Sequence, residues 1–154
     1  MPKIRKILFP TDFSDCSRVA KEYAFSFARD QGASLLILHV IEDIYLTEEA
    51  WEPLALNPDL FVEIEARAAK NVDGIVSDAQ KENLRATREV RRGKPFAEII
   101  LSAREGNADL VIMGTHGRSG LKHALIGSTA EKVVRKCPVP VLTIRCTKKK
   151  FEMP

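Results

Sequence analysis

The feature that most constrains the fold is a nearly continuous apolar run at residues 34–40, Ser-Leu-Leu-Ile-Leu-His-Val. A strand with alternating apolar residues can leave one face in water, whereas a strand that is apolar throughout must be covered on both faces. Strands of that kind are typical of parallel sheets with helices on both sides. The run therefore predicts a strand inside a covered parallel sheet.

Strands and helices are expected to alternate along the rest of the chain. Strands are predicted at residues 4–9, 34–40, 87–91, 109–113 and 139–144, the third nearer an edge because charged residues alternate along it. Helical spacing of apolar residues predicts helices that begin at Ser14 or Asp15, near Asp59, at Pro95 and at Ser128. This order specifies an α/β fold with right-handed crossovers. We expect a single domain over residues 1–147, followed by a basic tail at 148–154.

The bulk composition excludes several classes of protein. At 45% hydrophobic and 29% charged residues, the chain has an ordinary globular composition. Its apolar runs are too short to cross a membrane, and the basic N-terminus has no apolar signal core behind it, so we expect a cytoplasmic protein with no membrane partner. The net charge is only +3, and the lysines at 148–150 lack interleaved aromatic or arginine residues. That pattern favours a solvated tail over a nucleic-acid surface.

The three cysteines, Cys16, Cys137 and Cys146, are odd in number and widely spaced. This pattern predicts neither a disulfide framework nor a metal site. Cys16 and Cys137 fall on apolar helix faces, where a cysteine commonly acts as a small buried hydrophobic residue.

A glycine-rich loop carries the strongest functional signal. Gly114-Thr115-His116-Gly117 follows the fourth predicted strand, and Gly127-Ser128-Thr129 begins the last helix, giving the spacing G-x2-G-x9-G-[ST]. Glycine lets a backbone come close to a ligand, and a helix start offers unpaired N–H groups, so the combination suits a phosphate. The spacing matches neither the P-loop nor the G-x-G-x-x-G dinucleotide motif.

The position of this loop depends on the order of the strands. In an open parallel sheet, ligands bind beyond the carboxyl ends of the strands where the winding direction reverses. If the order is 3-2-1-4-5, that point lies between the first and fourth strands. Pro10-Thr11-Asp12 and Met113-Gly114 would then face each other.

Several of these residues also have a purely structural interpretation. Asp12 could cap the first helix, and Ser128 with Glu131 forms a capping box. The loop cations could be solvated or could hold phosphates: His116, Arg118, Lys122 and His123. His39 is expected to end the second strand as a hydrogen-bonded polar group.

Four segments together resemble the universal stress protein family, of the single-domain type: residues 7–14, 38–40, 109–114 with the glycine loop, and 137–142. The resemblance implies a Rossmann-like fold, a five-stranded parallel sheet in the order 3-2-1-4-5 with helices on both faces. It also implies the ATP-binding branch of the family, because the signature G-x2-G-x9-G-[ST] is complete.

The resemblance further implies which residues would hold ATP, with Mg²⁺ or Mn²⁺ carried on its phosphates. Residues beside the base and ribose would be Pro10, Thr11, Asp12, Val40 and Met113. Residues of the loop and helix start, beside the ribose and phosphates, would be Gly114, Gly117, Gly127, Ser128 and Thr129. Ala130 stands where some ATP-binding members carry another hydroxyl. No carboxylate besides Asp12 is an obvious dedicated ligand for the ion, and no metal-binding residues of the protein itself are predicted.

The last strand, from Val139 to Ile144, would form an exposed sheet edge, which favours pairing with another strand. The family commonly dimerises through this strand; the alternative is an edge protected by Pro140 and the basic tail.

We therefore expect a homodimeric, ATP-binding stress protein that regulates an unidentified protein partner, with slow or no hydrolysis. The alternatives are an adenylating or ATP-cleaving enzyme of the same superfold and a nucleotide-independent interaction module.

Overall fold

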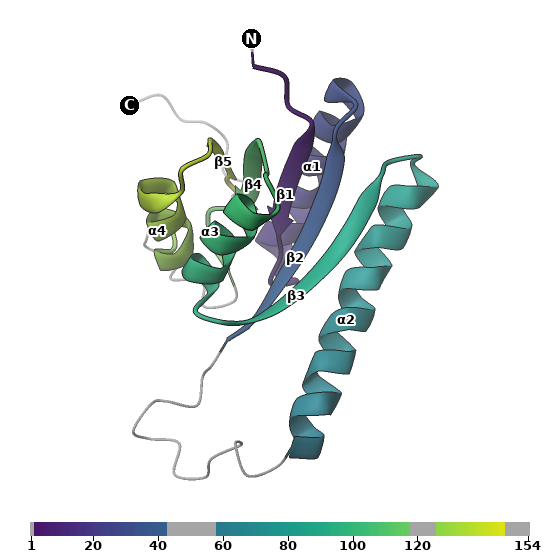
Figure 1. Cartoon of the computed structure of the whole chain (residues 1–154), viewed down its shortest axis with the longest axis vertical. Helices are drawn as coiled ribbons and strands as arrows, with labels where there is room; N and C mark the ends of the chain where they lie inside the picture. Colours follow the sequence, from purple (N-terminus) through teal and green to yellow (C-terminus); the bar gives the residue numbers. More distant parts are fainter. Residues whose placement is uncertain (1, 43–57, 118–125, 147–154) are drawn as a thin grey trace.

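The computed structural model of the 154-residue chain describes residues 2–42, 58–117 and 126–146 (Figure 1). Strands and helices alternate through these residues as predicted. In chain order they are β1 (Lys6–Pro10), α1 (Asp15–Gln31), β2 (Ser34–Glu42), α2 (Pro58–Lys81), β3 (Ala86–Gly93), α3 (Pro95–Glu105), β4 (Leu110–Gly114), α4 (Ser128–Lys136) and β5 (Val141–Ile144).

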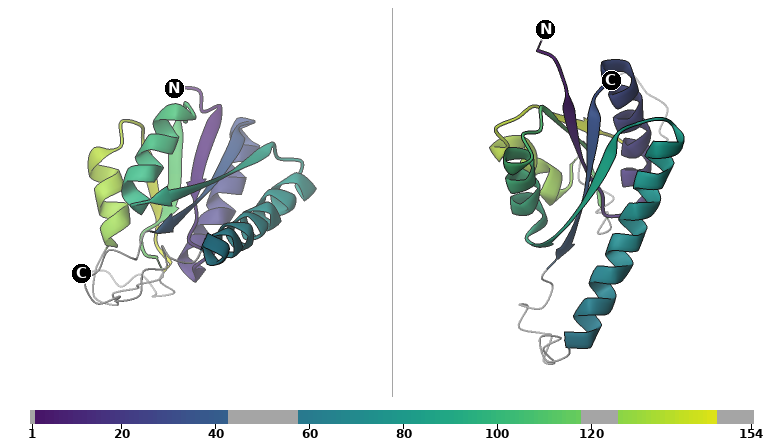
Figure 2. Two further views of the ribbon diagram at one scale, coloured as in Figure 1. Left: turned by 60° about the horizontal axis from the view of Figure 1, so that its bottom comes forward. Right: turned by 45° about the vertical axis from the view of Figure 1, so that its right-hand side comes forward.

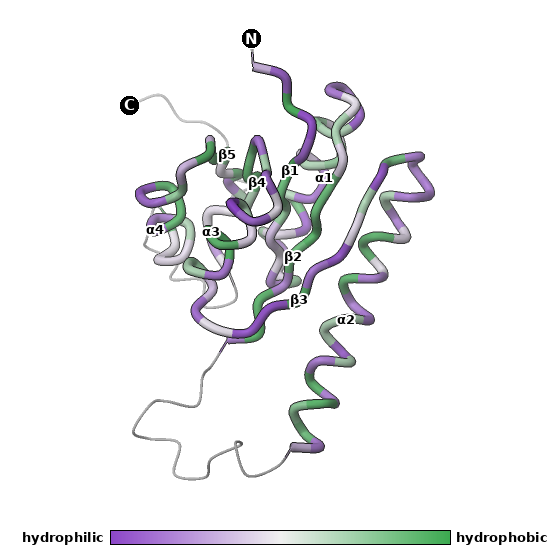
Figure 3. The backbone as a smooth tube through the Cα atoms, viewed as in Figure 1, coloured by the Kyte–Doolittle hydropathy of each residue, from purple (hydrophilic) through white to green (hydrophobic). Residues whose placement is uncertain are grey.

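The strands form one five-stranded sheet in the order β3-β2-β1-β4-β5, and every neighbouring pair is parallel. This confirms the predicted fold class and strand order. β3 lies at one edge, as its alternating charges indicate, and Figure 3 shows it mostly purple beside the green of β2.

Each face of the sheet is covered by its own pair of helices, as both panels of Figure 2 show. Successive residues of β1 point to opposite faces. Ile7 and Phe9 pack in the core under α1 and α2, whereas Leu8 packs in the core under α3 and α4. All three side chains are fully buried. β1 is thus the central strand of two hydrophobic cores.

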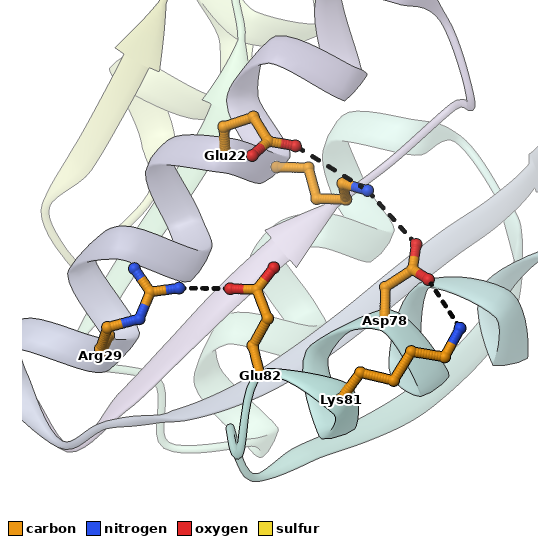
Figure 4. Close-up of polar contacts among 6 residues, drawn as sticks. Glu22, Arg29, Asp78, Lys81 and Glu82 are labelled. Atoms are coloured by element: carbon orange, nitrogen blue, oxygen red, sulfur yellow. Dashed lines mark hydrogen bonds and ion pairs between the residues drawn. The ribbon is translucent and has the colours of Figure 1, made fainter.

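Of the two helices on one face, α1 is joined by ion pairs to the C-terminal end of α2. Lys21 Nζ lies 3.4 Å from Asp78 Oδ2, and Arg29 pairs with Glu82. Figure 4 shows Arg29 facing Glu82, and Lys81 facing Asp78 on the same turn of α2. Surface pairs of this kind contribute about 0–1 kcal/mol each, so the apolar core supplies most of the stability of this helix pair.

The ends of some elements differ from the predicted ones. β5 begins at Val141 rather than at residue 139. Pro140 has no N–H to give to the sheet, and its carbonyl accepts the Val111 N–H at 3.0 Å just before the strand starts. Helix α1 is capped by Ser14, whose side chain accepts the Ser17 N–H at 3.2 Å, so Asp15 is the first helical residue. No helix among the described residues is both long and apolar enough to span a lipid bilayer.

Asp109 ties the start of β1 to the start of β4, and this contact makes stability depend on pH. Its carboxylate accepts the backbone N–H groups of Arg5 at 2.8 Å and Lys6 at 2.9 Å, which lowers the pKa of Asp109 below its ordinary value. A lowered pKa in the folded state stabilises the fold at neutral pH, and that contribution is lost as the pH falls through the folded-state pKa.

We expect an Asp109→Asn variant to be less stable at neutral pH and to match the wild type in acid. Urea unfolding of both proteins across the acid range would measure this; a difference that stays constant with pH would contradict it.

Candidate functional site

The winding of the sheet reverses between β1 and β4. β1 pairs with β2 at five positions, from Lys6 to Pro10, but with β4 only at Ile7↔Leu110 and Leu8↔Val111. Beyond these pairs the ladder between β1 and β4 ends, while each strand continues to its carboxyl end. This place is the topological switch point of the sheet, where open parallel α/β sheets bind ligands.

Thr11 shapes the turn that follows β1. Its N–H donates to the Leu38 carbonyl at 2.8 Å, and its Oγ1 lies 2.6 Å from Ser17 Oγ and accepts the Phe13 N–H at 3.1 Å. Thr11 is buried. Its hydroxyl is therefore engaged by the protein itself, and its structural role is to hold the turn that carries Asp12.

The same turn is supported from β2 by His39. The His39 Nδ1 lies 2.8 Å from the Thr11 carbonyl oxygen, and its ring packs against Phe13 with 4.5 Å between ring centroids. Phe13 has a left-handed backbone, with φ of 63°. His39 is hydrogen-bonded as predicted, but it lies inside β2, which continues to Glu42, and does not end the strand.

Asp12 brings the turn after β1 into contact with the glycine loop. Its Oδ1 accepts the Ser14 N–H at 3.0 Å, so it closes a local turn before the helix and is not the N-cap of α1. Its Oδ2 occupies the place where a Cβ on Gly117 would stand. A carboxylate from the end of β1 and the loop after β4 are thus in direct contact.

Two other glycines of the motif are packed against the protein's own backbone. A Cβ on Gly114 would lie 2.9 Å from Cys16 Sγ and 3.2 Å from the Cys16 carbonyl oxygen. A Cβ on Gly127 would lie 2.9 Å from the Thr115 carbonyl oxygen, which accepts the Gly127 N–H at 2.6 Å. These glycines allow α1 and the start of α4 to come close to the end of β4.

The contact at Gly114 leads to a stability prediction. We expect Gly114→Ala to destabilise the fold by about 1–3 kcal/mol, the usual range for overpacking, because the new methyl group meets the main chain of Cys16, which cannot rotate away. The free energy of unfolding in urea would measure the loss. A matched Gly74→Ala variant in α2, where a Cβ meets nothing within 4 Å, should not be destabilised. Equal stability of Gly114→Ala and the wild type would contradict the prediction.

The start of α4 differs from the predicted capping box. Gly127 is the N-cap and Ser128 is the first helical residue. The predicted capping box between Ser128 and Glu131 is therefore wrong. The Glu131 N–H donates to the Gly127 carbonyl at 2.9 Å, and no side chain caps the helix. Within the described part of the chain, no acceptor is bonded to the N–H groups of residues 128–130. Open amides at a helix start carry partial positive charge and attract anions.

The remaining predicted residues lie at the ends of three adjacent strands. Pro10 ends β1, Val40 lies in β2 and Met113 lies in β4. Pro10 and Met113 are buried, and Val40 and Met113 belong to the core under α3 and α4. They provide an apolar surface on the α3–α4 side of the switch point.

Of the predicted loop cations, Arg118, Lys122 and His123 lie outside the described residues. His116 is described, and its Nδ1 lies 2.9 Å from Thr115 Oγ1.

A cavity of about 360 Å³ opens on the other face of the sheet between α1 and α2, lined by Phe9, Thr11 and Phe13 among others. The cavity reaches the turn after β1 but its lining includes no glycine of the loop.

The structure also brings together cysteines that the sequence pattern did not connect. Cys16 at the start of α1 and Cys146 after β5 are neighbours, and both are free thiols, as is Cys137. Burial, together with the hydrogen bond that the Cys146 thiol donates to the Cys16 sulfur, raises the pKa of Cys146 to about 11. No motif spacing could have revealed this pair, because its two members come from opposite ends of the chain.

A parallel sheet in the order 3-2-1-4-5, covered on both faces and with a glycine loop at its switch point, defines a Rossmann-like α/β protein. The model of the Universal stress protein family matches residues 3–145. The chain belongs to the universal stress protein family, which has a role in stress responses.

Relatives match along nearly the whole length of the chain. Universal stress protein MJ0531 of Methanocaldococcus jannaschii is 32% identical over 149 residues, which cover 94% of this chain and 84% of that protein. Universal stress protein YxiE of Bacillus subtilis is 30% identical over 145 residues, covering 91% and 98%. The solved structure of MJ0577 from M. jannaschii superposes with a TM-score of 0.84 at 27% identity, covering 96% of this chain and 100% of that one.

Two more distant structures of the family were solved with nucleotides. A universal stress protein in complex with cAMP superposes with a TM-score of 0.65 at 20% identity, covering 95% of this chain and 100% of that one. A universal stress protein of Archaeoglobus fulgidus in complex with dAMP has a TM-score of 0.62 at 19% identity, covering 93% and 98%. At these identities the likeness is one of fold.

Proposed function

We propose that the chain binds ATP at the switch point between β1 and β4 and acts as a nucleotide-dependent regulator in the stress response. The observation that carries this proposal is the contact between Asp12 Oδ2 and Gly117. This contact places the Asp12 carboxylate beside the main chain of Gly117, which has no side chain. Gly117 belongs to the glycine motif that ends at the open amides at the start of α4. Adenine-nucleotide complexes of two proteins with this fold support the class of ligand.

The residues present suit the two ends of the nucleotide. Pro10, Val40 and Met113 would line the base, and Asp12 would accept a hydrogen bond from a ribose hydroxyl, as acidic residues do at other α/β switch points. Gly114 and Gly117 would bring the loop backbone to the ribose and phosphates. Gly127, Ser128 and Thr129 would hold the outer phosphates through the amides and hydroxyls at the start of α4, where the helix dipole favours negative charge. Thr11 would act by holding Asp12 in position.

The divalent ion, Mg²⁺ or Mn²⁺, would be carried on the phosphates. Mg²⁺ in nucleotide sites is usually held by one or two carboxylates together with phosphate oxygens and water. Among the described residues of the loop and the turn after β1, Asp12 is the carboxylate that fits, and one of its oxygens already accepts the Ser14 N–H. The ion would neutralise phosphate charge, and the protein itself would bind mainly the nucleoside and the triphosphate chain.

A regulatory role is favoured over a dedicated enzyme. Rapid phosphoryl transfer needs a positioned base or an arginine clamp. We assign neither role to a residue beside Asp12 and Gly117, so turnover would be slow or absent. An adenylating or ATP-cleaving enzyme remains the second hypothesis, and release of pyrophosphate or AMP with a defined acceptor would favour it; a nucleotide-independent interaction module is the third.

We further propose that two copies pair through β5. β5 is an edge strand, and its residues Val141, Leu142 and Thr143 are only partly buried. An unpaired edge has N–H and C=O groups available to a second strand. A single domain over residues 1–147, a cytoplasmic location and an unidentified protein partner remain predictions.

Calorimetric titration of the untagged protein with MgATP tests the proposed site. Saturable one-to-one binding is expected in the wild type, with weaker binding in Ser128→Ala and unchanged binding in a Val62→Ala control on the exposed face of α2. Mass spectrometry of nucleotide that co-purifies under native conditions provides an independent measurement. Absence of heat and of any thermal shift at millimolar MgATP would refute the proposal.

A further inference from the structure

A cluster of three metal-ligating side chains lies where the start of α1, the loop after β4 and the end of β5 meet. The Sγ atoms of Cys16 and Cys146 and one ring nitrogen of His116 all lie within 4.8 Å of one another. Cys16 is buried, whereas His116 and Cys146 are partly exposed. The cluster is thus closed on the side of the core and open on the other.

Backbone contacts hold the three contributing segments together. Gly114 of β4 pairs with Ile144 of β5, and the Thr115 N–H donates to the Ile144 carbonyl at 3.0 Å. The Cys16 thiol lies 3.8 Å from the same carbonyl. His116 and Cys146 therefore each follow, by two residues, a position that the sheet has already paired, and the donor atoms are brought together by the fold.

We infer that Cys16, His116 and Cys146 form a zinc site. Two thiolates and one imidazole are ligands that Zn²⁺ binds in tetrahedral sites with three protein ligands and one open position. Tetrahedral bonds of about 2.3 Å to sulfur and about 2.0 Å to nitrogen require donor atoms roughly 3.5–3.8 Å apart. Donor atoms up to 4.8 Å apart would need to approach by roughly 1.3 Å at most, and water would occupy the fourth position on the exposed side. Binding would release the two thiol protons to solvent.

The chemistry of the donors selects the ion. Mg²⁺ and Mn²⁺ prefer oxygen ligands, whereas sulfur and imidazole favour Zn²⁺. Thr115 Oγ1, 2.9 Å from His116 Nδ1, would serve as an outer partner that orients the imidazole. Zinc would join α1, the β4 loop and β5 at one point. This inference does not depend on nucleotide binding.

Metal titration of the untagged, reduced and metal-free protein tests the site. We expect one equivalent of Co²⁺ to produce a sulfur-to-metal charge-transfer band and tetrahedral visible bands, both abolished by one equivalent of Zn²⁺. Zinc affinity, measured by competition with a chromophoric chelator, should fall in Cys146→Ser and His116→Asn by more than the roughly 10–100-fold that loss of an outer partner costs. Cys137→Ser removes the cysteine outside the cluster and should keep the wild-type affinity.

A milder variant keeps the test decisive if a ligand substitution prevents folding. Thr115→Val keeps the shape of the side chain and should weaken zinc binding by roughly 10–100-fold, with an unchanged circular dichroism spectrum. A wild-type protein without the sulfur-to-cobalt band would overturn the proposal. So would a folded Cys146→Ser variant with wild-type zinc affinity, or an equal loss of affinity in Cys137→Ser.

Discussion

A Gly117→Val variant is expected to fold normally and to lose its stabilisation by MgATP. The new Cβ would stand where Asp12 Oδ2 now lies, and a carboxylate at the end of a flexible side chain can rotate away. Folding is therefore preserved, whereas the carboxylate leaves its place and the branched side chain fills the surface proposed for the nucleotide. A ligand present at 100 times its Kd stabilises a protein by about 2.7 kcal/mol, and we expect this contribution to disappear.

Thermal unfolding with and without MgATP would measure the effect. The wild type should show a clear increase in Tm and Gly117→Val none, with similar Tm values for both proteins without ligand. Gly74→Ala, which adds a methyl group in open space on α2, should retain the full increase. Tight MgATP binding by Gly117→Val would show that the nucleotide lies elsewhere.

Truncation of Phe9 to alanine should have the largest effect on stability. Phe9 is fully buried in the central strand, in the core that α1 and α2 cover. Removal of a buried phenyl ring loses its transfer free energy and leaves a cavity that neighbouring side chains fill only in part, which together cost about 3–5 kcal/mol. Much of the protein's total stability, typically about 5–15 kcal/mol, would then be lost.

The free energy of unfolding of Phe9→Ala in urea would give this cost directly. Val62→Ala is the matched control, because Val62 is 65% exposed on α2 and should change stability by less than about 0.5 kcal/mol. A loss below about 1 kcal/mol for Phe9→Ala would contradict the assignment of β1 as the strand on which both cores are built.

The order of the elements could be predicted because their signals are local. The apolar run that forms β2 implies cover on both faces, and Pro95 at the start of α3 has the fixed φ and missing N–H that suit a first helical position. The strand order, which the structure confirms, predicted that the turn after β1 would face the end of β4. The particular contact between Asp12 and Gly117 was not predicted.

Other features could not be predicted because they depend on contacts between distant segments. Gly127 became the N-cap of α4 because its N–H is bonded to the Thr115 carbonyl, which leaves Ser128 inside the helix. The neighbouring positions of Cys16 and Cys146 depend on how α1 crosses the ends of β4 and β5. No residue spacing encodes that crossing.

The central position of β1 determines when this fold can be completed during synthesis. β2 emerges soon after β1 and can pair with it, but the two bonds that tie the start of β1 to Asp109 join residues 103 and 104 positions apart. Until the ribosome has released β4, one side of β1 is an unpaired apolar edge that can recruit other nascent chains. Stalled or truncated products that end before residue 110 should therefore aggregate, and holdase chaperones are expected to bind this protein through its earliest strand.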